Sequence, residues 1–257
     1  MDRWAGKVAV VTGASAGIGA AIVKQLVSML VAGLARRVDK VKEMEEELGE
    51  CSGKLYAVEC DVSKEESVIA AFEWIQENLG IVNVLVNNAG MTKESSLIDG
   101  SLGDWRSVFD VNVFGLCLCT KEAVRMMREA GGEGVIININ SLAGERVPFI
   151  PGFSAYPASK RAITALAQTL RHELTGSQIR VTVQVRFCYL NTGNFSEGEN
   201  TIFNTIKWRK IYTEELHAAA ALYILSSAPK VVVSSTRIIH PLIIVTINSN
   251  LNCFRKH

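Results

Sequence analysis

The sequence has almost no net charge, because 27 lysine and arginine residues are balanced by 26 aspartate and glutamate residues. Such a balance creates no overall field that would attract nucleic acid or an anionic membrane surface, so we expect neither partner. Long hydrophobic runs are also lacking. The longest, at 238–247, is interrupted by His240 and Pro241 and is well short of the roughly 18 apolar residues that cross a bilayer. The run at 8–11 is too short for a secretory signal. We therefore expect a soluble, cytoplasmic protein without a transmembrane segment.

The cysteines lack a metal-binding pattern. None of the 6 forms a C-x-x-C pair, and no histidine cluster accompanies them. We therefore expect no metal site, and we interpret the cysteines as reduced thiols, mostly of the core. They are Cys51, Cys60, Cys117, Cys119, Cys188 and Cys253.

What the sequence does contain is enough apolar surface for a full core. Of its 257 residues, 48% are hydrophobic and 21% are charged, which excludes a disordered chain. Short β-branched runs alternate with longer amphipathic stretches, with no linker or internal repeat between them. This pattern predicts a single α/β domain over 1–257, a doubly wound (Rossmann) parallel sheet with helices on both faces. The predicted strands are 8–11, 31–34, 55–58, 82–86, 134–139, 179–185 and 238–246, and the predicted helices are 17–29, 38–48, 64–78, 104–128, 158–174 and 214–225.

A glycine-rich turn, Thr-Gly-Ala-Ser-Ala-Gly-Ile-Gly at 12–19, lies between the first predicted strand and the first predicted helix. Glycines allow a tight turn and a close approach of the backbone to a phosphate, and the helix that follows begins with free N–H groups and a partial positive charge. The pattern predicts a dinucleotide site, although a purely structural turn can have the same spacing. The residues expected to line the site are Gly13, Ala14, Ser15, Ala16, Gly17 and Ile18.

Two arginines, Arg36 and Arg37, stand where the second predicted strand ends, and the nearest acid, Asp39, comes two residues later. In dinucleotide-binding folds an acidic residue at this point holds the ribose 2′-hydroxyl of NAD(H), whereas arginine holds the 2′-phosphate of NADP(H). The sequence therefore favours NADP(H) over NAD(H). A solvated basic loop is the alternative interpretation of the same residues.

Further motifs follow the glycine turn in order along the chain. They are Asn87-Asn88-Ala89-Gly90 after the fourth predicted strand, Asn112, Ser141 after the fifth, and Tyr156-Pro157-Ala158-Ser159-Lys160. Together with the turn, this set resembles the short-chain dehydrogenase/reductase family over roughly residues 1–182, and more loosely over 211–233. The segments 1–4, 33–37 and 137–141 resemble a narrower group of that family, which includes insect farnesol dehydrogenases and vertebrate members that act on ketosteroids.

Tyr156 and Lys160 are four residues apart at the start of a predicted helix, a spacing that places both side chains on one face. A free tyrosine has a pKa of about 10, and a cation within about 4–6 Å lowers that pKa by roughly 1–3 units. Tyr156 is therefore expected to exchange a proton with an alcohol or a carbonyl compound near neutral pH. The resemblance implies a hydride transfer at the nicotinamide, with Tyr156 as the acid or base.

The resemblance also implies roles for the neighbouring motif residues. Ser141 would hydrogen-bond the substrate oxygen, and Lys160 would also hold the nicotinamide ribose. Asn112 would hold a backbone kink and a water that passes protons to Lys160. On the adenosine side the resemblance points to Asp61, Val62, Asn88, Ala89 and Gly90. Structural interpretations stay open for single residues: a strand-end cap for Ser141, a satisfied buried amide for Asn112 and a helix cap for Asp61.

The substrate is less well defined. The mostly apolar segment 145–153 would either line a pocket for a lipophilic alcohol or carbonyl compound, such as an isoprenoid or a steroid, or pack on the body of the domain. In the family the helices corresponding to 104–128 and 158–174 pair across two-fold axes. The resemblance therefore implies a homodimer or homotetramer.

Two segments depart from the family pattern in ways that bear on the fold. The connection between Gly19 and Arg36 is about two residues short and lacks the glycine expected near 28–30, so the family pattern does not fix the positions of Arg36 and Arg37. The C-terminal segment 234–257 resembles the family little, although 242–246 keeps the β-branched, apolar character of a strand.

A third departure lies close to the expected nicotinamide site. Phe187 and Cys188 replace the Pro-Gly that precedes the position of Thr192, a residue expected to reach the nicotinamide carboxamide. Two interpretations therefore stay open. The first is an NADP(H)-dependent alcohol dehydrogenase or carbonyl reductase, which the intact Ser141, Tyr156 and Lys160 favour. The second is a dinucleotide-binding homologue with weak or no turnover that acts as a sensor or partner subunit.

Overall fold

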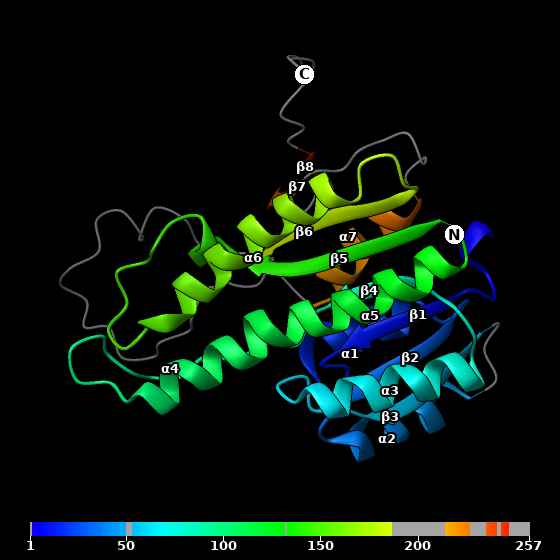
Figure 1. Ribbon diagram of the computed structural model, residues 1–257, viewed down its shortest axis with the longest axis horizontal. Helices are drawn as coiled ribbons and strands as arrows, with labels where there is room; N and C mark the ends of the chain where they lie inside the picture. Colours follow the sequence, from blue (N-terminus) through cyan, green and yellow to red (C-terminus); the bar gives the residue numbers. More distant parts are fainter. Residues whose placement is uncertain are drawn as a thin grey trace.

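The computed structural model describes residues 2–49, 53–131, 133–186, 214–226, 235–240 and 243–246. Within these residues, eight strands form one sheet in the order β3-β2-β1-β4-β5-β6-β7-β8 (Figure 1). Neighbouring strands are parallel except β7 and β8, which are antiparallel. The strands are β1 (Val8–Thr12), β2 (Leu30–Ala35), β3 (Lys54–Glu59), β4 (Val82–Asn87), β5 (Gly134–Ser141), β6 (Ile179–Arg186), β7 (Ser235–His240) and β8 (Ile243–Thr246).

Helices cover both faces of the sheet, which confirms the doubly wound α/β fold predicted from the sequence (Figure 1). One face carries α3 (Glu65–Asn78), α4 (Leu102–Phe109), α5 (Gly115–Glu129) and α6 (Ala155–Glu173), and the other carries α1 (Gly17–Gln25), α2 (Val38–Leu48) and α7 (Glu214–Ser226). Along β1, Val8 and Val10 belong to the core of the first face, and Ala9 and Val11 to that of the second. Because both faces are buried, the central strands are continuous apolar runs rather than alternating ones.

The strand order reverses beside β1, and this reversal creates the place for a site. The chain runs from β1 outward through β2 to β3 and then returns to β4 on the other side of β1. The segments that leave the carboxyl ends of β1 and β4 therefore diverge, and a crevice opens between them. The glycine turn leaves β1 and Asn88 follows β4, so the fold joins motifs that are 75 positions apart.

The shortened connection before Arg36 still leads that residue to the carboxyl edge of the sheet. Helix α1 ends at Gln25, earlier than predicted, and Leu26 closes the helix with a φ of −93°. Since Leu26 takes no left-handed conformation, this junction does not require the glycine that the family pattern contains. β2 then begins at Leu30 and ends directly before Arg36.

The stretch predicted as a helix at 104–128 is helical throughout, but its middle is a π-helical turn that the sequence did not predict. The structure divides this stretch into α4, the π-helical turn η2 (Asp110–Phe114) and α5. Asn112 lies inside η2, and its side chain exchanges two hydrogen bonds with the backbone of Met91. A π-helical turn contains one extra residue and is often found at functional sites. The apolar periodicity could not reveal the turn, because the bonds that stabilise it come from a distant segment.

The single last strand predicted at 238–246 is also wrong. β7 ends at His240, and β8 begins at Ile243 and pairs with β7 in the antiparallel direction. The next residue in the sequence after His240 is Pro241, which has no N–H group to donate to a sheet ladder. β7 itself is parallel to β6, so part of the atypical C-terminal segment extends the sheet.

Candidate active site

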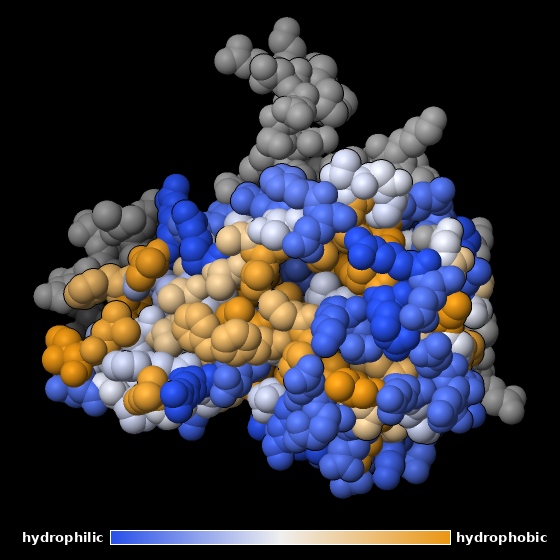
Figure 2. Space-filling model, viewed as in Figure 1, coloured by the Kyte–Doolittle hydropathy of each residue, from blue (hydrophilic) through white to orange (hydrophobic). Residues whose placement is uncertain are grey.

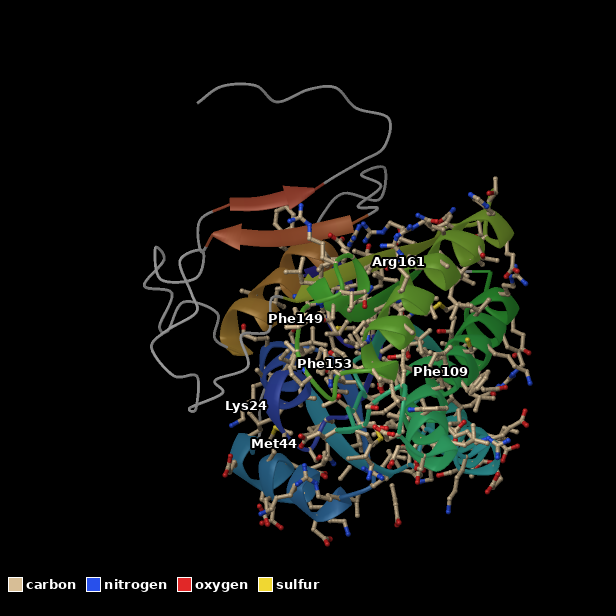
Figure 3. The ribbon with its side chains drawn as sticks, turned by 90° about the vertical axis from the view of Figure 1, so that its left-hand side faces the viewer. Lys24, Met44, Phe109, Phe149, Phe153 and Arg161 are labelled. Atoms are coloured by element: carbon tan, nitrogen blue, oxygen red, sulfur yellow. The ribbon has the colours of Figure 1, made fainter. Side chains whose placement is uncertain are left out.

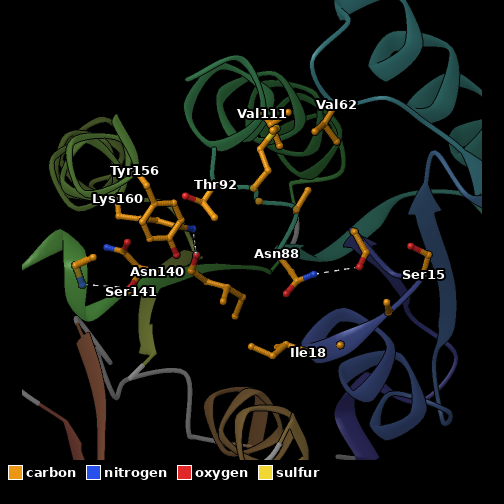
Figure 4. A pocket seen from close by; sticks show the side chains of 18 of the residues that line it. Ser15, Ile18, Val62, Asn88, Thr92, Val111, Asn140, Ser141, Tyr156 and Lys160 are labelled. Atoms are coloured by element: carbon orange, nitrogen blue, oxygen red, sulfur yellow. Dashed lines mark hydrogen bonds between the residues drawn. The ribbon is translucent and has the colours of Figure 1, made fainter. Parts of the chain in front are cut away.

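A cleft of about 650 Å³ opens at the carboxyl edge of the sheet, beside the reversal of strand order (Figure 4). Most residues predicted to form the site line this cleft: Gly13, Ser15, Ala16, Gly17, Ile18, Arg36, Arg37, Asp61, Val62, Asn88, Ala89, Gly90, Ser141, Tyr156 and Lys160. Ala14 is fully buried beneath the turn, and Asn112 lies behind the lining. Thr192, Phe187 and Cys188 lie outside the described residues.

The glycine turn packs closely against the end of β4. Gly13 has a φ of +66°, and a Cβ atom at this position would lie 2.9 Å from the Cα atom of Ala89. A Cβ atom at Gly19 would collide with the carbonyl of Gly13 and with the side chain of Asn88. Both positions therefore require glycine, the first for its backbone conformation and the second for space alone.

Thr12 and Asn88 hold this turn in place. The Oγ1 atom of Thr12 accepts the backbone N–H groups of Asn88 at 3.0 Å and of Ala89 at 2.9 Å. The Nδ2 atom of Asn88 donates to the carbonyls of Thr12 at 2.9 Å and of Gly13 at 3.2 Å. Asn88 thus acts on the turn itself, and the fold uses it to link the end of β4 to the loop after β1.

The first turn of α1 faces the cleft with the features of an anion site. The helix begins at Gly17, its N-cap residue Ala16 makes no side-chain capping bond, and its first turn has no acidic residue. Gly17 and Ile18 line the cleft. Uncapped N–H groups and the positive end of the helix dipole favour a phosphate at this position.

Arg36 and Arg37 are exposed at the mouth of the cleft. The Nη2 atom of Arg37 lies 3.4 Å from the Oγ atom of Ser15, a residue of the glycine turn. Among the described residues neither arginine forms an ion pair. Both residues line the cleft, so this basic pair borders the candidate dinucleotide site instead of forming a remote loop.

Asp61 is the acidic residue of the cleft lining. Its Oδ1 atom accepts the backbone N–H group of Ser63 at 3.1 Å and the hydroxyl of Ser63 at 2.7 Å. Partial burial raises the pKa of Asp61, but the bonds from Ser63 and the positive charges of Arg36 and Lys64 outweigh burial and lower the pKa below its ordinary value. Helix α3 has Lys64 as its N-cap residue, so Asp61 stabilises a local turn and does not cap that helix.

Tyr156 and Lys160 lie one turn apart on α6, and the end of β5 brings Ser141 to the same side of the cleft (Figure 4). The Nζ atom of Lys160 lies 5.7 Å from the centre of the Tyr156 ring and donates to the carbonyl of Ile139 at 3.1 Å. Lys160 is 5% exposed, so its charge acts on Tyr156 with little screening by solvent. The ring of Phe153 packs against Tyr156 with 4.7 Å between the centroids.

Ser141 is both a strand-end cap and a cleft residue. Its Oγ atom accepts the N–H group of Ala143 at 3.2 Å and thereby starts the short helix η3 (Leu142–Gly144). An oxygen that accepts from the backbone can still donate its own hydrogen. The capping interpretation and the substrate-binding interpretation therefore describe the same hydroxyl.

Asn112 braces the wall behind Lys160. Its Oδ1 atom accepts from the N–H group of Met91 at 2.8 Å, and its Nδ2 atom donates to the carbonyl of Met91 at 2.9 Å and to Ser159 Oγ at 3.0 Å. A Cβ atom at Gly90 would lie 3.4 Å from Asn112 Oδ1 and 3.6 Å from Lys160 Nζ. Gly90 therefore separates the two side chains, and the amide of Asn112 is satisfied within the protein.

The segment between η3 and α6 divides its side chains between the cleft and the solvent. Arg146, Pro148, Ile150 and Phe153 line the cleft. Val147 and Phe149 alternate with them and are exposed. Figure 3 places Phe149 and Phe153 on this segment. Both sequence interpretations of 145–153 thus describe part of the segment, since four of its residues line the cleft while Val147 and Phe149 face the solvent.

Several lining residues were not identified from the sequence. They are Leu34, Ala35, Cys60, Met91, Thr92, Val111, Ile139, Asn140, Leu142 and Ala143. Most are small or apolar and follow strand ends, where sequence offers no chemical signal to separate a lining residue from a core residue. The lining residues Arg146, Pro148, Ile150 and Phe153 belong to the segment 145–153, for which the sequence left a pocket wall and packing on the domain open.

Two of the three described thiols are buried, and that of Cys117 is half-buried. Cys60 and Cys119 are buried, and burial raises the pKa of Cys60 to about 11 and also raises the pKa of Cys119. No group of three metal-ligating side chains occurs among the described residues. Within the same part of the chain, no helix combines the length and the apolar character needed to cross a membrane.

Comparison with known proteins agrees with this geometry. The family model for short chain dehydrogenases matches residues 7–197. The farnesol dehydrogenase of Aedes aegypti is 49% identical over 188 residues, which are 71% of this chain and 77% of the relative. Dehydrogenase/reductase SDR family member 11 of Mus musculus is 38% identical over 244 residues, 90% of this chain and 93% of the relative. The crystal structure of a metagenomic short-chain oxidoreductase in complex with NADP superposes with a TM-score of 0.77 at 28% identity, covering 91% of this chain and 97% of the other.

Proposed function

The chain belongs to the short-chain dehydrogenase/reductase family, and from this premise we propose that it is an NADP(H)-dependent oxidoreductase acting on a lipophilic alcohol, ketone or aldehyde. The observation that carries the proposal is the convergence of Ser141, Tyr156 and Lys160 on one side of the cleft whose other side is the glycine turn. The cofactor, when bound, supplies hydride exchange at its nicotinamide ring.

The residues present fit such a dinucleotide. Gly13 and Gly19 let the turn pack where a Cβ atom would collide with the protein, which leaves its backbone close to the cleft, and the uncapped start of α1 offers N–H groups to a pyrophosphate. Asp61 and Val62 would hold the adenosine side. Lys160, whose Nζ atom lies between the carbonyl of Ile139 and the ring of Tyr156, would hold the nicotinamide ribose.

The proton chemistry belongs to the chain's own residues. Tyr156 would donate a proton to a carbonyl oxygen during reduction and accept it from an alcohol during oxidation. The buried ammonium of Lys160, 5.7 Å from the centre of the Tyr156 ring, would stabilise the negative charge that develops on the phenolic oxygen as the proton leaves. Ser141 would donate its hydrogen to the same substrate oxygen and hold it beside Tyr156. Asn112 would hold Met91 and Ser159 in position through its three side-chain hydrogen bonds.

The preference for NADP(H) rests on the pair of arginines. Replacing Arg37 with alanine is expected to weaken NADPH binding by about 10–100-fold, because a charge-assisted hydrogen bond contributes about 1.5–3 kcal/mol. NADH has no 2′-phosphate, so its affinity should change by less than about threefold. Titration of nicotinamide fluorescence measures both dissociation constants.

Arg106→Ala is the matched control for this experiment. Arg106 is an exposed arginine on α4 outside the cleft lining, and its removal should leave both affinities unchanged. If Arg37→Ala weakened the binding of NADPH and of NADH equally, Arg37 would not recognise the 2′-phosphate. The interpretation of the two arginines as a solvated basic loop would then be favoured.

A lipophilic substrate is supported by the wall of the cleft. Pro148, Ile150 and Phe153 present apolar surface on the side of Tyr156, and Met91 and Leu142 extend this surface. The farnesol dehydrogenase among the relatives suggests isoprenoid alcohols and aldehydes as the first compounds to assay, followed by steroid ketones.

A homodimer or homotetramer is also part of the proposal. On the face that carries α3 to α6, apolar residues gather over α4, α6 and the part of α5 next to α4, whereas the surface over α3 is mainly hydrophilic (Figure 2). Leu97, Ile98, Leu102 and Phe114 are exposed on or beside α4 and α5. Contiguous apolar surface of this kind commonly marks an interface.

The test of the proposed function is a titration with NADPH and NADH followed by addition of lipophilic ketones and aldehydes. Binding of NADPH with carbonyl-dependent loss of absorbance at the band of the reduced cofactor is the expected result. Tight binding without oxidation across the series would contradict the enzyme and favour the dinucleotide-binding homologue, with attention to Phe187 and Cys188. Absence of binding would contradict both.

A further inference from the structure

Helix α6 holds the strand end that presents Ser141, through a side-chain hydrogen bond that the proton chemistry above does not use. Asn140, the residue before Ser141, donates from its Nδ2 atom to the Oγ1 atom of Thr164 on α6 at 2.9 Å. Asn140 is 2% exposed and lines the cleft. Figure 4 shows Asn140 beside Ser141, on the side of the cleft that carries Tyr156 and Lys160.

Thr164 continues the row of proton-transfer residues along α6. Tyr156, Lys160 and Thr164 are spaced four residues apart, so their side chains follow one another on one face of the helix. Lys160 donates to the carbonyl of Ile139 at 3.1 Å, and Thr164 accepts from Asn140. One helix face therefore holds the two consecutive strand residues that come directly before Ser141.

The chain is also held to α6 after Ser141. Gly144, at the end of η3, passes so close to the helix that a Cβ atom would lie 2.7 Å from the carbonyl oxygen of Lys160. The Nη1 atom of Arg161 donates to the carbonyl of Gly144 at 3.1 Å. The segment that carries Ser141 is thus tied to α6 on both sides of the serine.

The sheet by itself does not provide this link. The backbone of β5 pairs with β4 and β6, and Ser141 lies opposite Arg186 of β6. Those ladders set the position of Ser141 relative to the sheet, whereas Tyr156 belongs to a helix packed on one face of it. Two hydroxyls that meet at one substrate oxygen must be held to a fraction of an ångström, which requires a direct bond between their elements.

We propose that Thr164, through its hydrogen bond to Asn140, is a positioning residue that sets the Ser141 hydroxyl relative to Tyr156 and Lys160 in the reaction. The inference rests on the proposed function, since it concerns the step that these three residues perform. Thr164 does not line the cleft and touches no reacting atom. Its loss should therefore affect the rate of the step more than the binding of either ligand.

The test compares Thr164→Val with Thr164→Ser. Valine has the shape of threonine without the hydroxyl, so Asn140 loses its acceptor, while serine keeps the hydroxyl. We expect Thr164→Val to lower kcat by about tenfold and to change the KM for the carbonyl substrate by less than about twofold. Thr164→Ser should restore most of the wild-type kcat, and the NADPH dissociation constant should be the same in all three proteins.

Thr120→Val is the matched control. Thr120 Oγ1 on α5 accepts from the Nδ2 atom of Asn87 at 2.9 Å, a buried bond of the same chemistry and length that ties β4 to α5 and does not involve α6. Its loss should lower thermal stability, as the loss of Thr164 does, while kcat stays at the wild-type value. If Thr164→Val does not fold, Asn140→Ser serves in its place, because serine is too short to reach Thr164.

The outcomes separate this inference from the proposed function. Three results would overturn the positioning role and leave the proposed oxidoreductase activity in place. They are a wild-type kcat in Thr164→Val, a loss of kcat in Thr120→Val equal to that in Thr164→Val, and a loss of kcat in Thr164→Ser as large as that in Thr164→Val. A wild-type protein that oxidises no NADPH with any carbonyl compound would overturn the proposed function, and the positioning role with it.

Discussion

Phenylalanine in place of Tyr156 is expected to lower kcat by about a thousandfold while leaving the affinity for NADPH nearly unchanged. The substitution removes one oxygen atom, the one that would give or take the proton. The ring remains, and so does its packing against Phe153 at 4.7 Å between centroids. Lys160 keeps its bond to the carbonyl of Ile139, so the remainder of the site is preserved. Absorbance of the reduced cofactor measures kcat, and nicotinamide fluorescence measures binding.

Tyr56→Phe is the control for the loss of a phenolic hydroxyl. Tyr56 lies on β3 outside the cleft, where its ring is 6.3 Å from that of Trp74. Its hydroxyl should contribute nothing to turnover. Tyr156→Phe with the kcat of the wild type would remove Tyr156 from the mechanism, and a matching loss of NADPH binding would point to a disrupted site instead of missing proton transfer.

Alanine at Gly19 is expected to damage the cofactor site, although the φ of Gly19 is not positive. The new Cβ atom would collide with the carbonyl of Gly13 and the Nδ2 atom of Asn88, and a backbone carbonyl cannot move aside as a flexible side chain can. Overpacking of this kind costs about 1–3 kcal/mol. Because the displaced atoms form the turn that would meet the phosphates, we expect the NADPH dissociation constant to rise by at least about tenfold, with a lower melting temperature.

Gly103→Ala provides the comparison for this variant. Gly103 also lies in a helix without a positive φ, but a Cβ atom there would meet only the Oγ atom of Ser101, at 3.7 Å. Alanine should stabilise that helix by about 0.5–1 kcal/mol and leave NADPH binding unchanged. An unchanged dissociation constant in Gly19→Ala would mean that the turn tolerates displacement and does not set the cofactor site.

Asn88 and Asn112 show that a sequence motif can identify a residue without revealing the contacts of its side chain. Asn88 is recognisable from its motif, yet its side chain serves the carbonyls of Thr12 and Gly13. Asn112 is equally recognisable, and its side-chain amide forms hydrogen bonds with Met91 and Ser159. In both cases the sequence identified a residue of the site, and its contacts depended on segments far away in the chain.

The sequence alone determined the fold class, the glycine turn, the basic pair at 36–37 and the spacing of Tyr156 and Lys160. These features are local: apolar periodicity, glycine placement and a four-residue helical interval are written in consecutive residues. The same locality explains why the sequence predicted neither the π-helical turn inside 104–128 nor the reversal of the chain inside 238–246, since both depend on bonds to other segments.

Only the tertiary structure decided which of these features meet, and how closely. It placed the turn at Gly13 against Ala89, turned Arg146 into the cleft and Val147 away from it, and joined Asn140 to Thr164 across 24 positions of the chain. The physical reason is that such contacts depend on the register of parallel strands and on how helices settle on the sheet. Register and packing arise from the sum of many long-range interactions, and no short stretch of sequence contains that sum.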